Sequence, residues 1–105
     1  MGAPQSLESS TLMATRWRRR RMCVLIADAP APAALREISA GGAFLETNAR
    51  PALGAKVELR HPYAGAILGE VRSIADDGVG IAFTYGEQSV AFALAAIAAD
   101  MSRPG

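Results

Sequence analysis

The chain has 105 residues, of which 11 are basic and 10 acidic, and a formal net charge of +1. This length favours one domain, and the near-neutral charge argues against a protein whose whole surface binds nucleic acid. One cysteine, one histidine and no apolar run near the ~20 residues of a membrane span exclude a disulfide framework, a His-rich metal cluster and a transmembrane helix, so we expect a cytoplasmic protein.

The charge is unevenly spread along the chain. Residues 1–21 carry five Arg and one Glu, a net of +4, whereas residues 22–105 carry six basic and nine acidic groups, a net of −3. Residues 1–15 are small and polar without periodicity, which predicts a flexible leader. The five arginines of residues 16–21 follow, and their charges repel one another. This repulsion disfavours an isolated helix.

The next part of the chain is typical of short β-strands separated by turns. Pro30 and Pro32 are expected to block a central strand, and the glycines of residues 39–42 are expected to allow a turn with positive φ. The only histidine, His61, is expected to be solvated in a tight turn at residues 61–65, and a hairpin turn is predicted at residues 76–78. The six predicted strands are residues 22–26, 34–38, 43–47, 55–60, 66–74 and 79–84.

A change of hydrophobic period predicts a helix over residues 87–101. Its apolar residues are spaced four, three and four apart, which places Val90, Leu94, Ile97 and Met101 on one face. Six short strands and one helix predict a mainly β domain, a small antiparallel barrel with this helical face covering an open end or side. We therefore divide the chain into a leader (1–15), one domain (16–101) and a tail (102–105).

No arrangement of residues points to catalysis. The sequence has no Gly-x-Ser-x-Gly motif and no phosphate-binding loop. Cys23 lies in an apolar run and is expected to be a buried, inert thiol, and Asp76 and Asp77 are first of all turn formers. The sequence therefore predicts a protein that is not an enzyme and has no metal or cofactor.

Two short motifs remain, and their order along the chain resembles that of the PilZ domain family. Arg16, Trp17, Arg18, Arg19 and Arg20 match an Arg-x-x-x-Arg segment just before the first strand. Residues 37–42, with Ser39 and Gly42 in place, match an Asp/Asn-x-Ser-x-x-Gly motif except at Glu37. Residues 42–47, 53–59 and 78–83 also look family-like, so the resemblance covers about residues 16–100.

The resemblance implies a six-stranded barrel with a C-terminal helix, and a bacterial receptor for the second messenger cyclic di-GMP. Arginine suits this ligand because its planar fork pairs with phosphates and guanine edges. By this resemblance, the ordering of the arginine segment around the nucleotide would create a surface for an unidentified downstream protein. The ligand-binding residues that the resemblance implies are Arg16, Arg20, Arg21, Glu37, Ser39, Gly41 and Gly42, with Trp17 as a candidate for stacking on a base.

Three features depart from the family pattern, namely the residue at position 37, the length of the first hairpin and the register of the arginines. Glu37 replaces Asp or Asn, and the first hairpin is short, because seventeen residues separate Arg21 from Ser39. The working arginine pair is either Arg16 and Arg20 or Arg16 and Arg21. An alternative is therefore a PilZ-like protein-interaction module that does not bind the nucleotide. A third reading, a basic arm for nucleic acid or anionic lipid, is disfavoured for nucleic acid because aromatic side chains for stacking are sparse.

Overall fold

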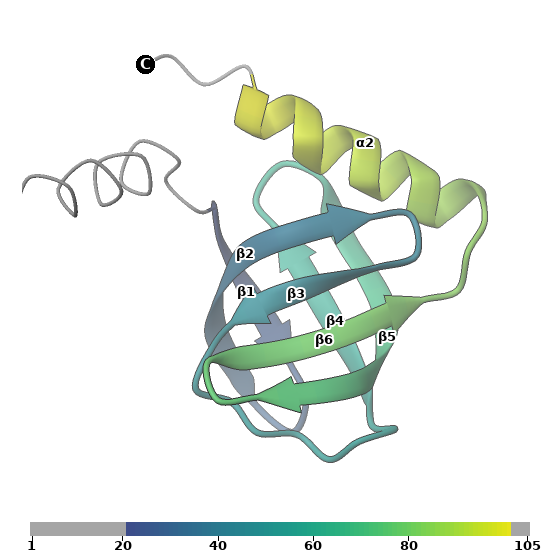
Figure 1. The fold of residues 1–105 in the computed structure, drawn as a ribbon. Helices are drawn as coiled ribbons and strands as arrows, with labels where there is room; N and C mark the ends of the chain where they lie inside the picture. Colours follow the sequence, from purple (N-terminus) through teal and green to yellow (C-terminus); the bar gives the residue numbers. More distant parts are fainter. Residues whose placement is uncertain (1–20, 102–105) are drawn as a thin grey trace, which may run out of the picture.

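The computed structural model describes residues 21–101 of the chain. These residues form a closed antiparallel barrel with the strand order β1-β2-β3-β6-β5-β4, and one helix, α2, lies across an end of it (Figure 1). This confirms the predicted fold class. The elements are β1 (Arg21–Ile26), β2 (Pro30–Ser39), β3 (Gly42–Glu46), β4 (Lys56–His61), β5 (Gly65–Ala75), β6 (Gly78–Phe83) and α2 (Glu87–Met101).

The barrel core follows from alternation of apolar side chains along the strands. Val57 and Leu59 on β4 are buried, as are Val79, Ile81 and Phe83 on β6, whereas the residues between them are more exposed. Such alternation places every second side chain inside a closed sheet. The largest fully buried apolar side chains are Leu25, Leu45, Leu59, Val71 and Val79.

The first hairpin is short but complete. All six residues of β1 pair with β2, from Arg21 opposite Leu35 to Ile26 opposite Pro30. The same strand pairs with β4, which places Leu25 opposite Leu59 and closes the barrel. A first strand of this length is therefore long enough to join both neighbours.

The predicted start of the second strand at residue 34, after the two prolines, is wrong, because β2 begins at Pro30. Both prolines lie in β2, opposite Ile26 and Val24 of β1. Pairing of β2 with β3 reaches only to Ala34 opposite Glu46, so this first part of β2 has one strand neighbour. A proline has no N–H to donate, and it is tolerated where that side of a strand has no ladder partner.

The predicted inward face of the helix is also wrong. Leu94 is 62% exposed and Ile97 is 39% exposed. The side chains of α2 that are buried instead are Ser89, Phe92, Ala93 and Ala96. The ring of Phe92 packs edge-on against Phe83, with ring centroids 5.8 Å apart, and the alanines beside it let the helix approach the barrel. Tertiary packing therefore selects a different stripe from the one with the largest side chains.

Candidate functional site

An open hollow of about 310 Å³ is lined by residues of β2, β3 and β6. These three strands run side by side in the barrel (Figure 1). The lining of the hollow combines two polar side chains, Glu37 and Ser39, with apolar groups that include Phe44 and Ile81. The remaining lining residues are Ile38, Gly42 and Ala43. The hollow thus contains the predicted motif residues Glu37, Ser39 and Gly42, and Gly41 lies in the adjoining turn.

A β-bulge turns the motif side chains outward. The register of β2 against β3 shifts between Leu35 and Glu37, so Arg36 and Glu37 are both exposed although they are consecutive. An extra residue in one strand reverses the facing of every residue beyond it. Ile38 therefore packs against the core, while Glu37 and Ser39 face the solvent on the same side of the strand.

Glu37 is the unengaged acceptor of this hollow. Its carboxylate is exposed and makes no hydrogen bond or ion pair with any residue that the structure describes. Ser39 accepts a hydrogen bond at Oγ from the backbone N–H of Gly41, at 3.2 Å. That bond holds the turn after β2, and the Gly41 carbonyl in turn accepts from the N–H of Phe83 at 2.9 Å. The motif turn is therefore fixed against β6 before any ligand arrives.

The two glycines of the motif differ from expectation, because neither has a positive φ. In the part of the chain that the structure describes, the glycines with positive φ are Gly54 and Gly65. A Cβ at Gly42 would overlap the backbone carbonyl of Ile81, whereas a Cβ at Gly41 would meet only the Oγ of Ser39, at 3.8 Å. Gly42 thus permits close packing of β3 on β6, and Gly41 leaves open space at the rim of the hollow.

Arg36 lies beside the hollow and Phe44 lines it, and neither residue is among the ligand-binding residues expected from the sequence. The Arg36 guanidinium stacks over the Phe44 ring at 4.2 Å and donates to Glu46 at 3.1 Å and to Asp77 at 2.9 Å. The hydrogen bond that Arg36 donates to Asp77 lowers the pKa of the Asp77 carboxyl group. One sequence feature could have pointed to the Phe44 ring, namely the two glycines at positions 78 and 80. In the structure Gly78 and Gly80 lie next to Phe44, and a Cβ at Gly78 would come within 2.7 Å of the ring.

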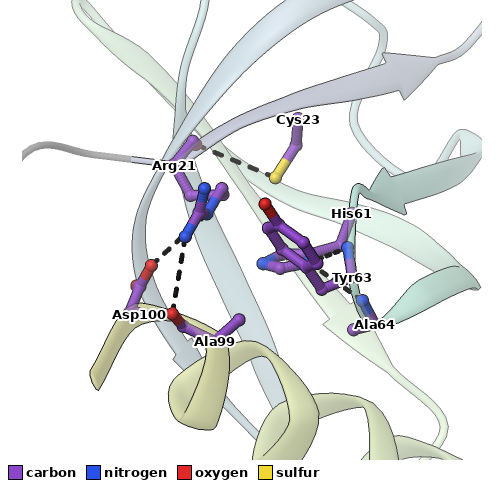
Figure 2. A network of polar contacts seen from close by, with 7 residues as sticks. All are labelled: Arg21, Cys23, His61, Tyr63, Ala64, Ala99 and Asp100. Atoms are coloured by element: carbon purple, nitrogen blue, oxygen red, sulfur yellow. Dashed lines mark hydrogen bonds and ion pairs between the residues drawn. The ribbon is translucent and has the colours of Figure 1, made fainter. Parts of the chain in front are cut away.

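The side chain of Arg21 contacts the end of α2 and not the hollow. Its Nη2 lies 3.5 Å from the carbonyl oxygen of Ala99, its Nε lies 3.5 Å from the carboxylate of Asp100, and its guanidinium stacks on Tyr63 at 4.8 Å (Figure 2). These contacts join the start of β1 to the C-terminal end of α2. The structure therefore does not bring Arg21 together with Glu37 and Ser39.

The expectation that His61 is solvated in a tight turn is wrong, because His61 is the last residue of β4 and is only 4% exposed. Its Nδ1 accepts two backbone hydrogen bonds, from the N–H groups of Tyr63 and Ala64, both at 3.0 Å (Figure 2). Burial, and then the positive charge of Arg21, lower the pKa of His61. Cys23 is buried nearby, where burial raises the pKa of its thiol to about 11, as befits an inert thiol.

Arg16, Trp17 and Arg20 lie outside the described residues. The place where they join the barrel is nevertheless defined, because Arg21 pairs with Leu35 of β2, two residues before Glu37. Within residues 21–101 no group of three or more His, Cys, Asp or Glu side chains could hold a metal ion. No helix in that same range is long and apolar enough to cross a membrane.

Comparison with known proteins agrees with this arrangement of strands and motif. The family model of the PilZ domain matches residues 16–97, which include both motifs and the entire barrel. No curated protein is similar enough in sequence to count as a relative of the chain. The PilZ family is one of binding domains and not of catalysts, and its general role is that of a cyclic di-GMP receptor. With most of its length matched, the chain belongs to the PilZ domain family.

Proposed function

We propose that this protein is a receptor that binds cyclic di-GMP at the hollow of β2, β3 and β6 and relays the signal to another protein. The observation that carries this proposal is the carboxylate of Glu37, which has no partner among residues 21–101 and lies beside the turn held by Ser39. A carboxylate is an acceptor only, and guanine offers N1–H and N2–H donors on one edge. Glu37 is therefore suited to accept from a guanine base.

The phosphates of the ligand need a different partner. Around the hollow, the three carboxylates of Glu37, Glu46 and Asp77 outnumber the two described arginines, namely Arg36, which is bound to two of these carboxylates, and Arg50, whose charge acts on Asp77. This surface is therefore acidic and repels a phosphate. The arginines of residues 16–20 supply the positive charge that the hollow lacks, and they join the barrel beside β2.

The contacts of Arg21 favour one register of the arginine pair. Because Arg21 contacts Asp100 and Ala99, using it on the ligand would require these contacts to break. Arg16 and Arg20 satisfy the family spacing and leave the helix end intact, so we assign the phosphate contacts to this pair. Ordering of the segment on the ligand creates a combined protein and nucleotide surface in the cytoplasm for the downstream protein to recognise.

Titration calorimetry with cyclic di-GMP at moderate salt tests the proposal. We expect Glu37→Gln to weaken binding about tenfold, because an amide presents one acceptor and introduces repelling N–H donors. Glu37→Asp restores the residue type of the family motif and retains binding. The matched control is Glu70→Gln, which removes a carboxylate on β5 that is paired with Lys56 at 3.8 Å and should change nothing.

One observation favours the alternative of an interaction module without nucleotide, namely the extra methylene of Glu37 relative to the family residue. The same titration separates the two functions. Absence of heat for the wild-type protein at tens of micromolar, with heat restored in Glu37→Asp, assigns the protein to the interaction module. Absence of heat in both proteins refutes the nucleotide site altogether.

A further inference from the structure

A second hollow, of about 420 Å³, is lined by residues of β4, β5 and β6 and by Thr84. It is larger than the hollow that contains Glu37, and the two hollows share no lining residue. Its volume lies in the usual range of ligand pockets, about 300–1,000 Å³. The proposed nucleotide site uses no residue of this second hollow.

Arg72 lines the second hollow at a β-bulge. The register of β5 against β6 shifts between Val71 and Ser73, so Arg72 has no residue opposite it on β6. Val71 is buried, whereas Arg72 and Ser73 are both exposed although they are consecutive. Bulges re-aim side chains and are over-represented beside functional sites. The irregularity of β5 therefore points to a use for the Arg72 side chain.

Within residues 21–101, Arg72 is the only Lys or Arg side chain that makes no hydrogen bond or ion pair. Arg50 donates to backbone carbonyl groups. The other described cations each pair with a carboxylate, and they are Arg21, Arg36, Lys56 and Arg60. The described chain thus offers no acceptor to the five N–H groups of the Arg72 guanidinium.

The charges of the lining fit a carboxylate better than a phosphate monoester. Lys56 and Arg72 supply two positive charges and Glu70 one negative charge, a net of +1. The Lys56 side chain is 81% exposed and lies 3.8 Å from Glu70, so this ion pair is weak. One carboxylate balances the net charge, whereas a phosphate monoester carries about −2 and is repelled by Glu70. The planar guanidinium of Arg72 also matches the two oxygens of a carboxylate.

An apolar contact is available on the same strand as Arg72. Leu68 lines the hollow and is 73% exposed, and Ala82 and Phe83 add apolar lining from β6. Leu68 and Arg72 are four positions apart on β5, roughly 13 Å along a strand. In an extended peptide, side chains an even number of positions apart point to the same face. A peptide with an apolar residue four positions from an acidic residue therefore reaches both.

We propose that the second hollow binds an extended peptide segment of another protein, with an acidic side chain on Arg72 and an apolar side chain on Leu68. The exposed side chain of Thr84 adds a hydroxyl donor to the lining. This site adjoins the nucleotide hollow, because Ala82 of its lining pairs with Gly42 of the other. Peptide binding nevertheless uses no residue assigned to the nucleotide.

An NMR titration of the full chain without nucleotide tests this proposal. The probe is a capped pentapeptide, Leu-Ser-Ser-Ser-Asp, and the control peptide carries Asn in place of Asp. We expect amide shifts confined to residues 54–56, 68–72 and 82–84, with half-saturation near about 1 mM for so small a contact. The control peptide should bind at least about fivefold more weakly, and added salt should weaken binding of the acidic peptide.

Two arginine variants test the assigned partner of the carboxylate. Arg72→Gln should weaken binding of the acidic peptide at least about fivefold, because it removes a charged hydrogen-bond donor. Arg60→Gln is the matched control, since Arg60 on β4 pairs with Glu58 at 3.1 Å and does not line the hollow. This control should bind the peptide like the wild type.

Several results would overturn the proposal. These are the absence of shifts at about 5 mM peptide, equal binding of the two peptides, and equal loss in Arg72→Gln and Arg60→Gln. Tighter binding of inorganic phosphate than of the acidic peptide would assign the hollow to a phosphorylated ligand instead. A loss of cyclic di-GMP binding in Arg72→Gln, with peptide binding unchanged, would place Arg72 in the nucleotide site. The peptide titrations need no nucleotide, so the two proposals fail separately.

Discussion

Gly41 and Gly42 are neighbours in one turn, yet they are required for different reasons. The backbone of β6 lies directly against Gly42, whereas open space surrounds Gly41. The motif glycine closest to the candidate site is thus a packing residue between two strands. Single residues near this hollow therefore divide into those that hold the barrel together and those, such as Glu37, whose exposed side chains bond to no residue that the structure describes.

The two alanine variants of this turn separate these roles. Gly42→Ala should lower the free energy of unfolding by about 2 kcal/mol or more, because its Cβ meets a backbone carbonyl that cannot move without distorting the pairing of β3 and β6. Gly41→Ala should change it by less than about 0.5 kcal/mol. Chemical denaturation measures both, and equal effects would show that the close contact at Gly42 is relieved at no cost.

His61 makes the stability of the domain depend on pH. Its pKa is lowered in the folded protein, while in the unfolded chain it is about 6.5, so the unfolded chain takes up the proton first as pH falls. The stabilisation is complete above about pH 6.5 and is lost as pH falls from there through the lower, folded pKa.

A matched variant tests the contribution of this residue. In His61→Asn the side-chain oxygen can still accept from the N–H groups of Tyr63 and Ala64, but it does not titrate. Urea denaturation between pH 7.5 and pH 5 should therefore give a flatter stability profile for the variant, over the range where histidine titrates. Identical profiles would mean that carboxylates alone cause the pH dependence.

At the scale of elements, α2 presents apolar residues on both of its sides. The side that holds the barrel is chosen by the fit of one aromatic ring. Phe92 lies edge-on to both Phe83 and His61, with centroids 5.8 Å and 6.1 Å away.

A pair of truncations in α2 tests which side is the buried one. Phe92→Ala should destabilise the domain by about 3–5 kcal/mol, the range for removing a buried aromatic ring. Leu94→Ala should change the stability by less than about 0.5 kcal/mol when measured in dilute solution. Thermal or urea unfolding at low protein concentration distinguishes the two. A larger loss for Leu94→Ala would restore the helix face expected from the spacing of the large residues.

At the scale of the whole molecule, the alternation of apolar and polar residues along the sequence predicted the strands. It could do so because a closed barrel buries every second residue of a strand, as Val57 and Leu59 illustrate. The same pattern could not show that Pro30 and Pro32 belong to β2, since this depends on which side of the strand has a neighbour. The motif identified Glu37 and Ser39. The bulge that turns them outward, and the contacts of Arg21 with α2, depend on tertiary contacts that local sequence does not encode.

The contact between Arg21 and Asp100 has a consequence for how this domain can be combined with others. The first described strand begins at one partner of this 3.5 Å ion pair, and the helix is about to end at the other. The start of β1 and the end of α2 therefore lie beside each other. A unit with this geometry can be placed inside a surface loop of a host protein without pulling the loop apart.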